Sequence, residues 1–101
     1  MKIENEGQEL RISEIPELTA VNSGAFREEV RAALPEAPTL VEIDLSQTRF
    51  LDSSGLGALF ALYRSAQATK GVRLRLINPT REVYQLLELT QMQQLFEISR
   101  S

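Results

Sequence analysis

Residues 50–57 bring one carboxylate, two hydroxyls and two glycines to the point where an alternating apolar segment gives way to an apolar helical pattern. The acid is Asp52, the hydroxyls belong to Ser53 and Ser54, and Gly55 follows directly. Serine and aspartate most often cap a helix here, because their side-chain oxygens accept hydrogen bonds from unpaired N–H groups of the first turn. A helix N-terminus also attracts negative charge, so a phosphate on Ser53 would be electrostatically favourable. These residues therefore predict either a plain cap or a phosphorylation site.

Two residue types that carry much of protein chemistry are missing, because the 101-residue chain contains no cysteine and no histidine. Their absence removes thiol nucleophiles, Ser-His-Asp triads, imidazole acid–base catalysis and nearly all zinc sites. We therefore expect a protein that is not an enzyme and that carries no metal or other cofactor.

Charge and hydropathy limit the expected partners and location of the chain. The net charge is −3 and the eleven basic residues are dispersed, so no basic stripe is available to neutralise the phosphates of a nucleic acid. No apolar run approaches the roughly 20 residues that span a membrane, and the N-terminal residues do not resemble a signal segment. We expect one soluble, cytoplasmic domain that binds no nucleic acid and does not cross a membrane.

Three short segments alternate apolar and polar residues, which is the pattern of a strand with one buried face. The polar positions of the second and third segments carry opposite charges, which predicts a solvated sheet face on which neighbouring strands pair their charges. A strand at 2–6 is expected to be short or absent, and residues 95–98 are expected to form an edge strand. The alternating apolar residues are Leu10 and Ile12; Val41, Ile43 and Leu45; and Val72, Leu74 and Leu76, and the charges belong to Glu42, Asp44, Arg73 and Arg75.

Helical patterns separate these strands. The first is expected at 22–34, the second at 54–69, and the third after Asn78, with Pro79 at the first helical position. Strands and helices that alternate in this way imply right-handed βαβ crossovers. The prediction is an α/β fold in a single domain of residues 1–101, with its core at about 9–98. It has a mixed four- to five-stranded sheet with helices mainly on one face.

The second helical pattern is apolar on more than one face. One stripe, from Leu56 to Ala66, is wide enough to pack on a sheet, yet no charge occurs between Leu56 and Tyr63. A helix that is apolar all round is either deeply buried or contacts a partner, so a neighbouring helix or a partner protein must cover its second face. Phosphate on Ser53 would add a charge of about −1.5 to −2 at the rim of such a contact surface. The partner-binding candidates on this helix are Leu56, Gly57, Ala58, Ala61 and Leu62.

The sequence around these residues resembles the STAS domain of bacterial anti-sigma-factor antagonists. The resemblance covers nearly the whole chain from about residue 9 and implies a STAS-type domain. Its most specific element is the run Phe50-Leu51-Asp52-Ser53-Ser54-Gly55-Leu56-Gly57 after an alternating strand. Residues 41–45, 72–79, 83–89 and 95–98 carry the rest.

The resemblance implies a binding protein that is switched by phosphorylation. Unphosphorylated members of this family bind an anti-sigma factor that is also a serine kinase, and so release a sigma factor. The kinase phosphorylates the serine after the aspartate, and a metal-dependent serine phosphatase reverses the step. Carried onto this chain, the phosphoacceptor is Ser53 and the adjacent acid is Asp52, while Ser54 and Gly55 shape the loop and supply backbone N–H groups. ATP and magnesium belong to the kinase.

The chain departs from the family pattern before the first helix. Antagonists commonly have Gly-Glu-Leu-Asp there, whereas this chain has Pro16, Glu17, Leu18 and Thr19. The loop belongs to the kinase-contact region of the family, so Glu17 and Thr19 are further partner-binding candidates. Pro16 fixes the backbone and removes a donor. Thr19 is expected to keep the turn, because its hydroxyl still accepts a backbone hydrogen bond.

Two other functions remain open. STAS domains also serve as constitutive accessory subunits of lipid-transport ATPases and as modules of signalling scaffolds, and in that role Ser53 would be only a helix cap. Glycines at a helix start also suggest nucleotide binding. Against that function, the chain has no Gly-x-x-x-x-Gly-Lys-Ser/Thr loop, and Lys70 lies at the far end of the helix from Ser53.

Overall fold

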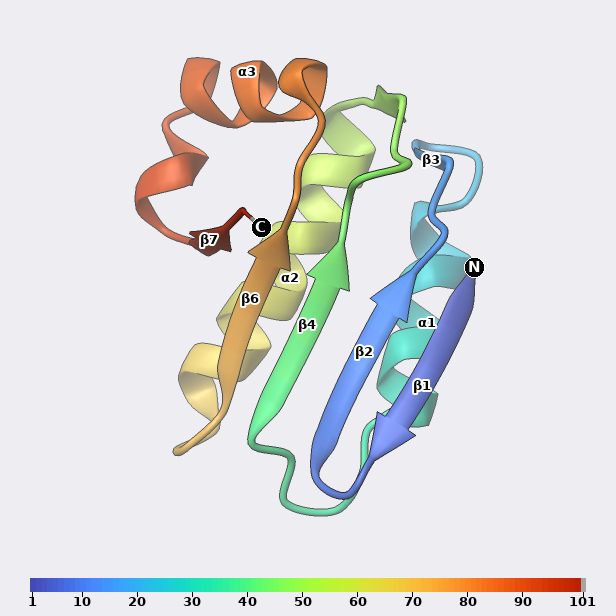
Figure 1. Cartoon of the computed structure of the whole chain (residues 1–101), viewed down its shortest axis with the longest axis vertical. Helices are drawn as coiled ribbons and strands as arrows, with labels where there is room; N and C mark the ends of the chain where they lie inside the picture. The colour runs from blue at the N-terminus through green and yellow to red at the C-terminus, as the bar shows by residue number, and fades with distance from the viewer. Residues whose placement is uncertain (101) are drawn as a thin grey trace.

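The computed structural model describes residues 1–100 as a mixed sheet covered by two helices on one face, with a third helix at the end of the sheet (Figure 1). The strand alternation and the helical periodicity predicted from the sequence both appear. In chain order the elements are β1 (Lys2–Glu6), β2 (Glu9–Ser13), β3 (Glu17–Leu18), α1 (Ser23–Ala33), β4 (Leu40–Asp44), β5 (Phe50–Leu51), α2 (Ser53–Ala68), β6 (Arg73–Ile77), α3 (Arg81–Leu89), the 3-10 turn η1 (Met92–Gln94) and β7 (Glu97–Ser99).

The main sheet has five strands in the order β1-β2-β4-β6-β7. Only β1 is antiparallel to its neighbour, so the sheet is mixed, as predicted. The expectation that the first strand is short or absent was wrong, because β1 pairs with β2 along all five of its residues. The sequence pattern is weak there because Ile3 is the one apolar side chain between Lys2 and Glu6; it lies opposite Ile12 and packs against the core.

The core lies between the sheet and the helices α1 and α2, which Figure 1 shows on the same face. The apolar positions of the alternating strands point into it, and Phe26 and Val30 of α1 pack against them. Because period two sends alternate side chains to opposite faces, the charged positions lie on the other side. The fully buried large aliphatic side chains are Leu10, Ile12, Leu18, Ile43, Leu45, Leu59, Leu76, Leu87, Val30 and Val83.

Side-chain caps mark where α2 and α3 begin. Asn22 precedes α1 but its side chain forms no capping hydrogen bond, whereas Asp52 caps α2, and this helix begins one residue earlier than expected, at Ser53. The prediction that Pro79 takes the first position of the third helix was wrong. Thr80 is the N-cap of α3, and its hydroxyl accepts a hydrogen bond from the Val83 N–H at 3.3 Å. No helix within residues 1–100 is long and apolar enough to cross a membrane.

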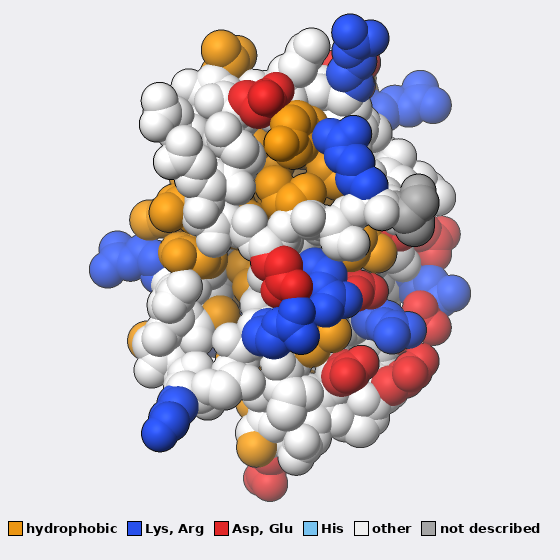
Figure 2. All heavy atoms as spheres, turned by 60° about the vertical axis from the view of Figure 1, so that its left-hand side comes forward, with side chains coloured by type: hydrophobic (Ala, Val, Ile, Leu, Met, Phe, Trp, Pro, Cys, Tyr) orange, Lys and Arg blue, Asp and Glu red, His pale blue; other side chains and the backbone are white. Residues whose placement is uncertain are grey.

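The open face of the sheet pairs its charges across strands, as expected. Glu42 lies opposite Arg75 in the register, and their side chains are 3.0 Å apart. The other Glu42 oxygen lies 3.6 Å from Arg11, while Glu97 contacts both Arg73 and Arg75. Figure 2 shows acidic and basic side chains interleaved on the surface that it presents. This face therefore satisfies most of its charges within the chain.

Candidate functional site

A second, two-stranded sheet places the two loops of the candidate site side by side. β3 and β5 pair in parallel, with Glu17 opposite Phe50 and Leu18 opposite Leu51. The loop before α1 therefore lies against the segment that leads into α2. A hydrogen bond from the Arg49 N–H to the Pro16 carbonyl, 3.0 Å long, extends the contact. The sequence did not predict this pairing, because two-residue strands have no readable period.

Asp52 joins the two loops at the start of α2. Its Oδ1 accepts a hydrogen bond from the Gly55 N–H at 2.9 Å, and its Oδ2 accepts one from the Ala20 N–H at 3.0 Å. The predicted cap is therefore present, and the same carboxylate also holds the loop before α1. These two N–H groups, Gly55 first, lower the pKa of Asp52 because they stabilise the ionised carboxylate.

Gly55 is needed for close packing. A Cβ atom at this position would lie 1.9 Å from the Leu18 carbonyl oxygen and 2.6 Å from Leu51 Cδ1. Real Cβ atoms do not approach other atoms so closely, so any other residue would push α2 away from β3. The Gly55 N–H, which the family resemblance assigned to the loop, donates to Asp52.

Ser53 and Ser54 are the first two residues of α2, and both are exposed to solvent. Within the described residues 1–100, neither hydroxyl takes part in a hydrogen bond. Ser53 therefore presents an unoccupied hydroxyl at a helix N-terminus whose backbone is held by its neighbours Asp52 and Gly55. Residues 1–100 contain no cluster of acidic side chains that could hold a metal ion.

The loop before α1 is held by its own side chains. The Asn22 Oδ1 accepts a hydrogen bond from the Thr19 N–H, its Nδ2 donates to the Glu17 carbonyl, and both distances are 2.8 Å. The Thr19 hydroxyl accepts from the Val21 N–H at 3.3 Å, as predicted for the turn. The loop therefore presents Val21, which is 88% exposed, on an ordered backbone. The three-residue spacing of Thr19 and Asn22 is the sequence signal for this arrangement.

Thr48 is a buried polar residue that the sequence did not single out. Its hydroxyl donates to the Ile15 carbonyl at 2.6 Å, and its own carbonyl accepts from the Thr80 hydroxyl at 2.9 Å. It thereby ties the loop after β4 to the segment before β3 and to the start of α3. A threonine among turn residues gives no sign of burial in the sequence.

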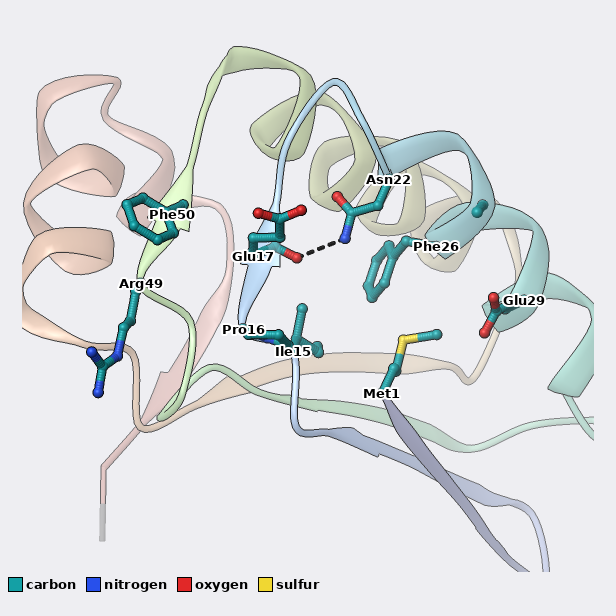
Figure 3. Close-up of a pocket in the computed structure, with 10 residues that line it drawn as sticks. Met1, Ile15, Pro16, Glu17, Asn22, Phe26, Glu29, Arg49 and Phe50 are labelled. Carbon is teal, nitrogen blue, oxygen red and sulfur yellow. Dashed lines mark hydrogen bonds between the residues drawn. The ribbon is translucent and has the colours of Figure 1, made fainter.

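A hollow of about 470 Å³ opens beside β5. Ile15 and Phe26 form its apolar floor, and Glu17 and Phe50 lie on neighbouring strands at its edge (Figure 3). The Arg49 side chain, in the same view, points away from Phe26. Phe50 is 64% exposed, so most of its ring is open to solvent beside the hollow. Its position in the motif of residues 50–57 does not by itself indicate this exposure.

The partner-binding candidates on α2 separate into three groups. Leu56 and Ala58 are 6% and 2% exposed and belong to the core beneath α1 and α2, so their listing as partner-binding residues was wrong, whereas the expected packing of Leu56 on the sheet is confirmed. Gly57 is exposed, and a Cβ atom there would meet no other atom within 4 Å. Ala61 and Leu62 are half-buried in a groove between α1 and α2. Glu17 in β3 and Thr19 in the loop after it are half-buried.

Comparison with known proteins agrees with this architecture. The structure resembles that of a Thermotoga maritima protein assigned as an anti-sigma factor antagonist, with a TM-score of 0.90 and 20% identity over 99% of this chain and 86% of that chain. It also resembles the anti-sigma factor antagonist SpoIIAA in its unphosphorylated form, with a TM-score of 0.69 and 21% identity over 99% and 86%. No curated protein matches the chain in a sequence search. The family model described as the STAS domain matches residues 5–101, and the chain therefore belongs to the STAS domain family.

Proposed function

We propose that this chain is an anti-sigma factor antagonist and that phosphorylation of Ser53 switches its binding. In its unphosphorylated form it binds an anti-sigma factor that is also a serine kinase, and so releases a sigma factor in the cytoplasm. The kinase phosphorylates Ser53, and a metal-dependent serine phosphatase restores the free hydroxyl. The chain itself acts by binding and catalyses no reaction. The names of its two structural neighbours support this role.

The observation that carries the proposal is the presentation of Ser53. Its side chain is exposed at the first position of α2, while Asp52 and Gly55 on either side fix the backbone. A kinase that approaches from solvent can therefore reach the hydroxyl without unfolding the helix. A phosphate there lies at the positive end of the helix dipole, so the modified protein keeps its fold.

Phosphorylation would change the surface around Ser53 more than the fold. The phosphate adds a charge of about −1.5 to −2 next to the Asp52 carboxylate. Val21 lies on the loop that Asp52 holds, and Phe50 lies two residues before Asp52. A partner that covers these two apolar side chains would have to desolvate the phosphate as well, which costs free energy unless the partner supplies cations. We assign the contact surface to Ser53, Val21 and Phe50, together with Glu17 and Thr19.

The first experiment locates the phosphate. The purified protein is incubated with ATP, magnesium and a kinase that co-purifies with it or is encoded beside it, and is then examined by mass spectrometry. We expect phosphate on Ser53, none in Ser53→Ala, and normal modification of Ser54→Ala, which changes the neighbouring hydroxyl. A stable kinase complex without phosphate transfer would contradict the switch.

The second experiment measures binding to that kinase. Ser53→Asp adds a permanent negative charge and is expected to weaken the complex, whereas Ser53→Ala binds like the parent protein. Phe50→Ala is expected to weaken binding about tenfold or more, because exposed aromatic side chains often dominate interfaces. Leu89→Ala is the matched control, since Leu89 is 81% exposed on α3 and lies outside the proposed surface. Equal losses from Phe50→Ala and Leu89→Ala would contradict the assignment of the surface.

A second candidate function is a constitutive accessory subunit of a lipid-transport ATPase or a signalling scaffold. One observation favours it: Asp52 and Gly55 have sufficient structural reasons to be present, as a cap and as a site of close packing. Affinity purification distinguishes the two. A transporter ATPase as the main partner supports the subunit, and a kinase that modifies Ser53 supports the switch.

A further inference from the structure

A groove between α1 and α2 lies apart from the surface around Ser53. It encloses about 230 Å³, and Leu34, Ala61 and Leu62 provide its apolar lining. A smaller crevice of about 80 Å³ shares Leu34 and Leu62 with it and continues to Val41 and Leu74 of the sheet. Ala61 follows Ser53 by eight residues, which corresponds to about 12 Å along the helix axis. The groove is therefore a separate surface.

The side of α2 that faces the groove carries only small residues along one line. Gly57, Ala61 and Ser65 recur at every fourth position and therefore lie along one side of the helix. Gly57 has open space where a Cβ atom would lie, so packing within the chain does not require glycine. An exposed glycine inside a helix destabilises the helix relative to alanine. Small side chains of this kind let the backbone of another helix approach closely.

The charged residues that line the groove are two arginines and one glutamate, an excess of one positive charge, although the chain as a whole carries a net charge of −3. The arginines are Arg27 and Arg31 of α1. Arg31 pairs with Glu28 at 2.7 Å, whereas Arg27 forms no ion pair within residues 1–100. The rim of the groove therefore presents more positive than negative charge around an apolar floor.

We propose that this groove binds an amphipathic helix of a partner protein, with apolar side chains against Leu34 and Leu62 and acidic side chains towards Arg27 and Arg31. The concave shape and the small residues of α2 favour a helix over a flat surface. Anionic membrane surfaces are usually recognised by clusters of four or more basic residues, and the rim includes Glu28 as well. The proposal does not depend on phosphorylation of Ser53.

The test uses a synthetic helical peptide of about 16 residues with leucines along one edge and glutamates beside them, a length that spans about 24 Å. The control peptide has lysine in place of every glutamate. We expect the acidic peptide to bind the full-length protein in fluorescence anisotropy and to shift amide signals of residues 27–34 and 57–65. Arg27→Glu and Arg31→Glu should each weaken binding about tenfold, and Arg81→Glu, an exposed arginine on α3, should leave it unchanged.

Four results would overturn the proposal. The first is absence of binding by the acidic peptide at about 1 mM, where even weak complexes are visible, and the second is equal binding of the lysine peptide. Binding to phosphatidylglycerol vesicles that Arg27→Glu abolishes would assign the groove to lipid. Self-association that Arg27→Glu abolishes, measured by sedimentation, would assign it to a second copy of the chain. Thermal melts of each variant exclude loss of fold, and the mass-spectrometric test of Ser53 is independent of all four.

Discussion

The open face of the sheet and the surface around Ser53 are both exposed to solvent, but their side chains are arranged in different ways. On the sheet face, Glu42 and Glu97 are each contacted by two arginines from neighbouring strands. Around Ser53 the polar groups that form hydrogen bonds hold the backbone, and large apolar side chains are exposed beside the two serine hydroxyls. Val21 and Phe50 remain uncovered although Asp52 and Asn22 keep their loops ordered.

This difference separates two kinds of surface. Charges that are paired within the chain offer little to a partner, because a partner would have to break existing ion pairs. Exposed apolar side chains on an ordered backbone cost little entropy when they become buried in a complex. We therefore infer that a partner contacts the end of the sheet near Ser53 rather than the open face.

The largest effect that would sharpen this comparison is expected from Gly55→Ala. The added methyl group would meet the Leu18 carbonyl at 1.9 Å, so the start of α2 must shift, and we expect a loss of about 3 kcal/mol in the free energy of unfolding. Gly57→Ala is the matched control in the same helix. It meets no atom, and should stabilise the protein by about 0.5–1 kcal/mol. Urea unfolding measures both, and similar effects would contradict the role given to Gly55.

A somewhat smaller loss is expected from Thr48→Val. The substitution keeps the shape of the side chain but leaves the buried Ile15 carbonyl without its donor, at a cost of about 1–3 kcal/mol. Thr39→Val provides the comparison, because Thr39 is exposed and its bond to the Gln8 carbonyl is long, at 3.4 Å. We expect it to change the unfolding free energy by less than about 0.5 kcal/mol. Equal losses in urea unfolding would show that Thr48 does not hold the site loops.

Asp52→Asn should change how stability depends on pH. The Gly55 and Ala20 N–H groups lower the pKa of Asp52 in the folded protein, so its contribution is present above the ordinary aspartate pKa of about 3.9. That contribution is lost as the pH falls through the lower pKa of the folded state. Asparagine can still cap the helix but does not titrate. The melting temperature should therefore fall less steeply between about pH 6 and pH 2.5 for Asp52→Asn than for the parent protein. Parallel curves would contradict the role of the ionised Asp52 carboxylate in joining the two loops.

The smallest effect is expected on the open face, from Arg75→Gln. Glu42 keeps its contact with Arg11, and the pair is partly solvated, so the loss should stay below about 1 kcal/mol. The difference should shrink further when the unfolding is repeated in about 1 M NaCl, because salt screens exposed pairs. Arg81→Gln removes an arginine that forms no ion pair within residues 1–100 and serves as the control. A loss as large as that of Gly55→Ala would erase the contrast between the two surfaces.

Much of the fold could be predicted from the sequence because its signals are local. The period-two segments became β2, β4 and β6, and the helical patterns became α1, α2 and α3. The cap at Asp52 was readable because capping is an interaction over three residues. The solvated sheet face followed from the same alternation, since each apolar position implies a charged neighbour on the opposite side.

Other features of the site depend on residues far apart in the chain. The pairing of β3 with β5 joins segments about thirty residues apart, and neither has enough residues to show a period. The need for glycine at position 55 arises from Leu18, and the burial of Thr48 arises from Ile15 and Thr80. The apolar pattern of α2 could not tell which faces are covered by the chain itself, so Ala58 was expected at the surface and lies in the core.

The sequence by itself determined the elements, the cap of α2 and the family resemblance, because helices, strands and caps are set by neighbours along the chain. Only the tertiary structure decided which side chains remain exposed around Ser53. Exposure depends on what packs against each residue, and those neighbours come from distant parts of the chain. Val21 and Phe50 are therefore unremarkable in the sequence and prominent on the folded surface.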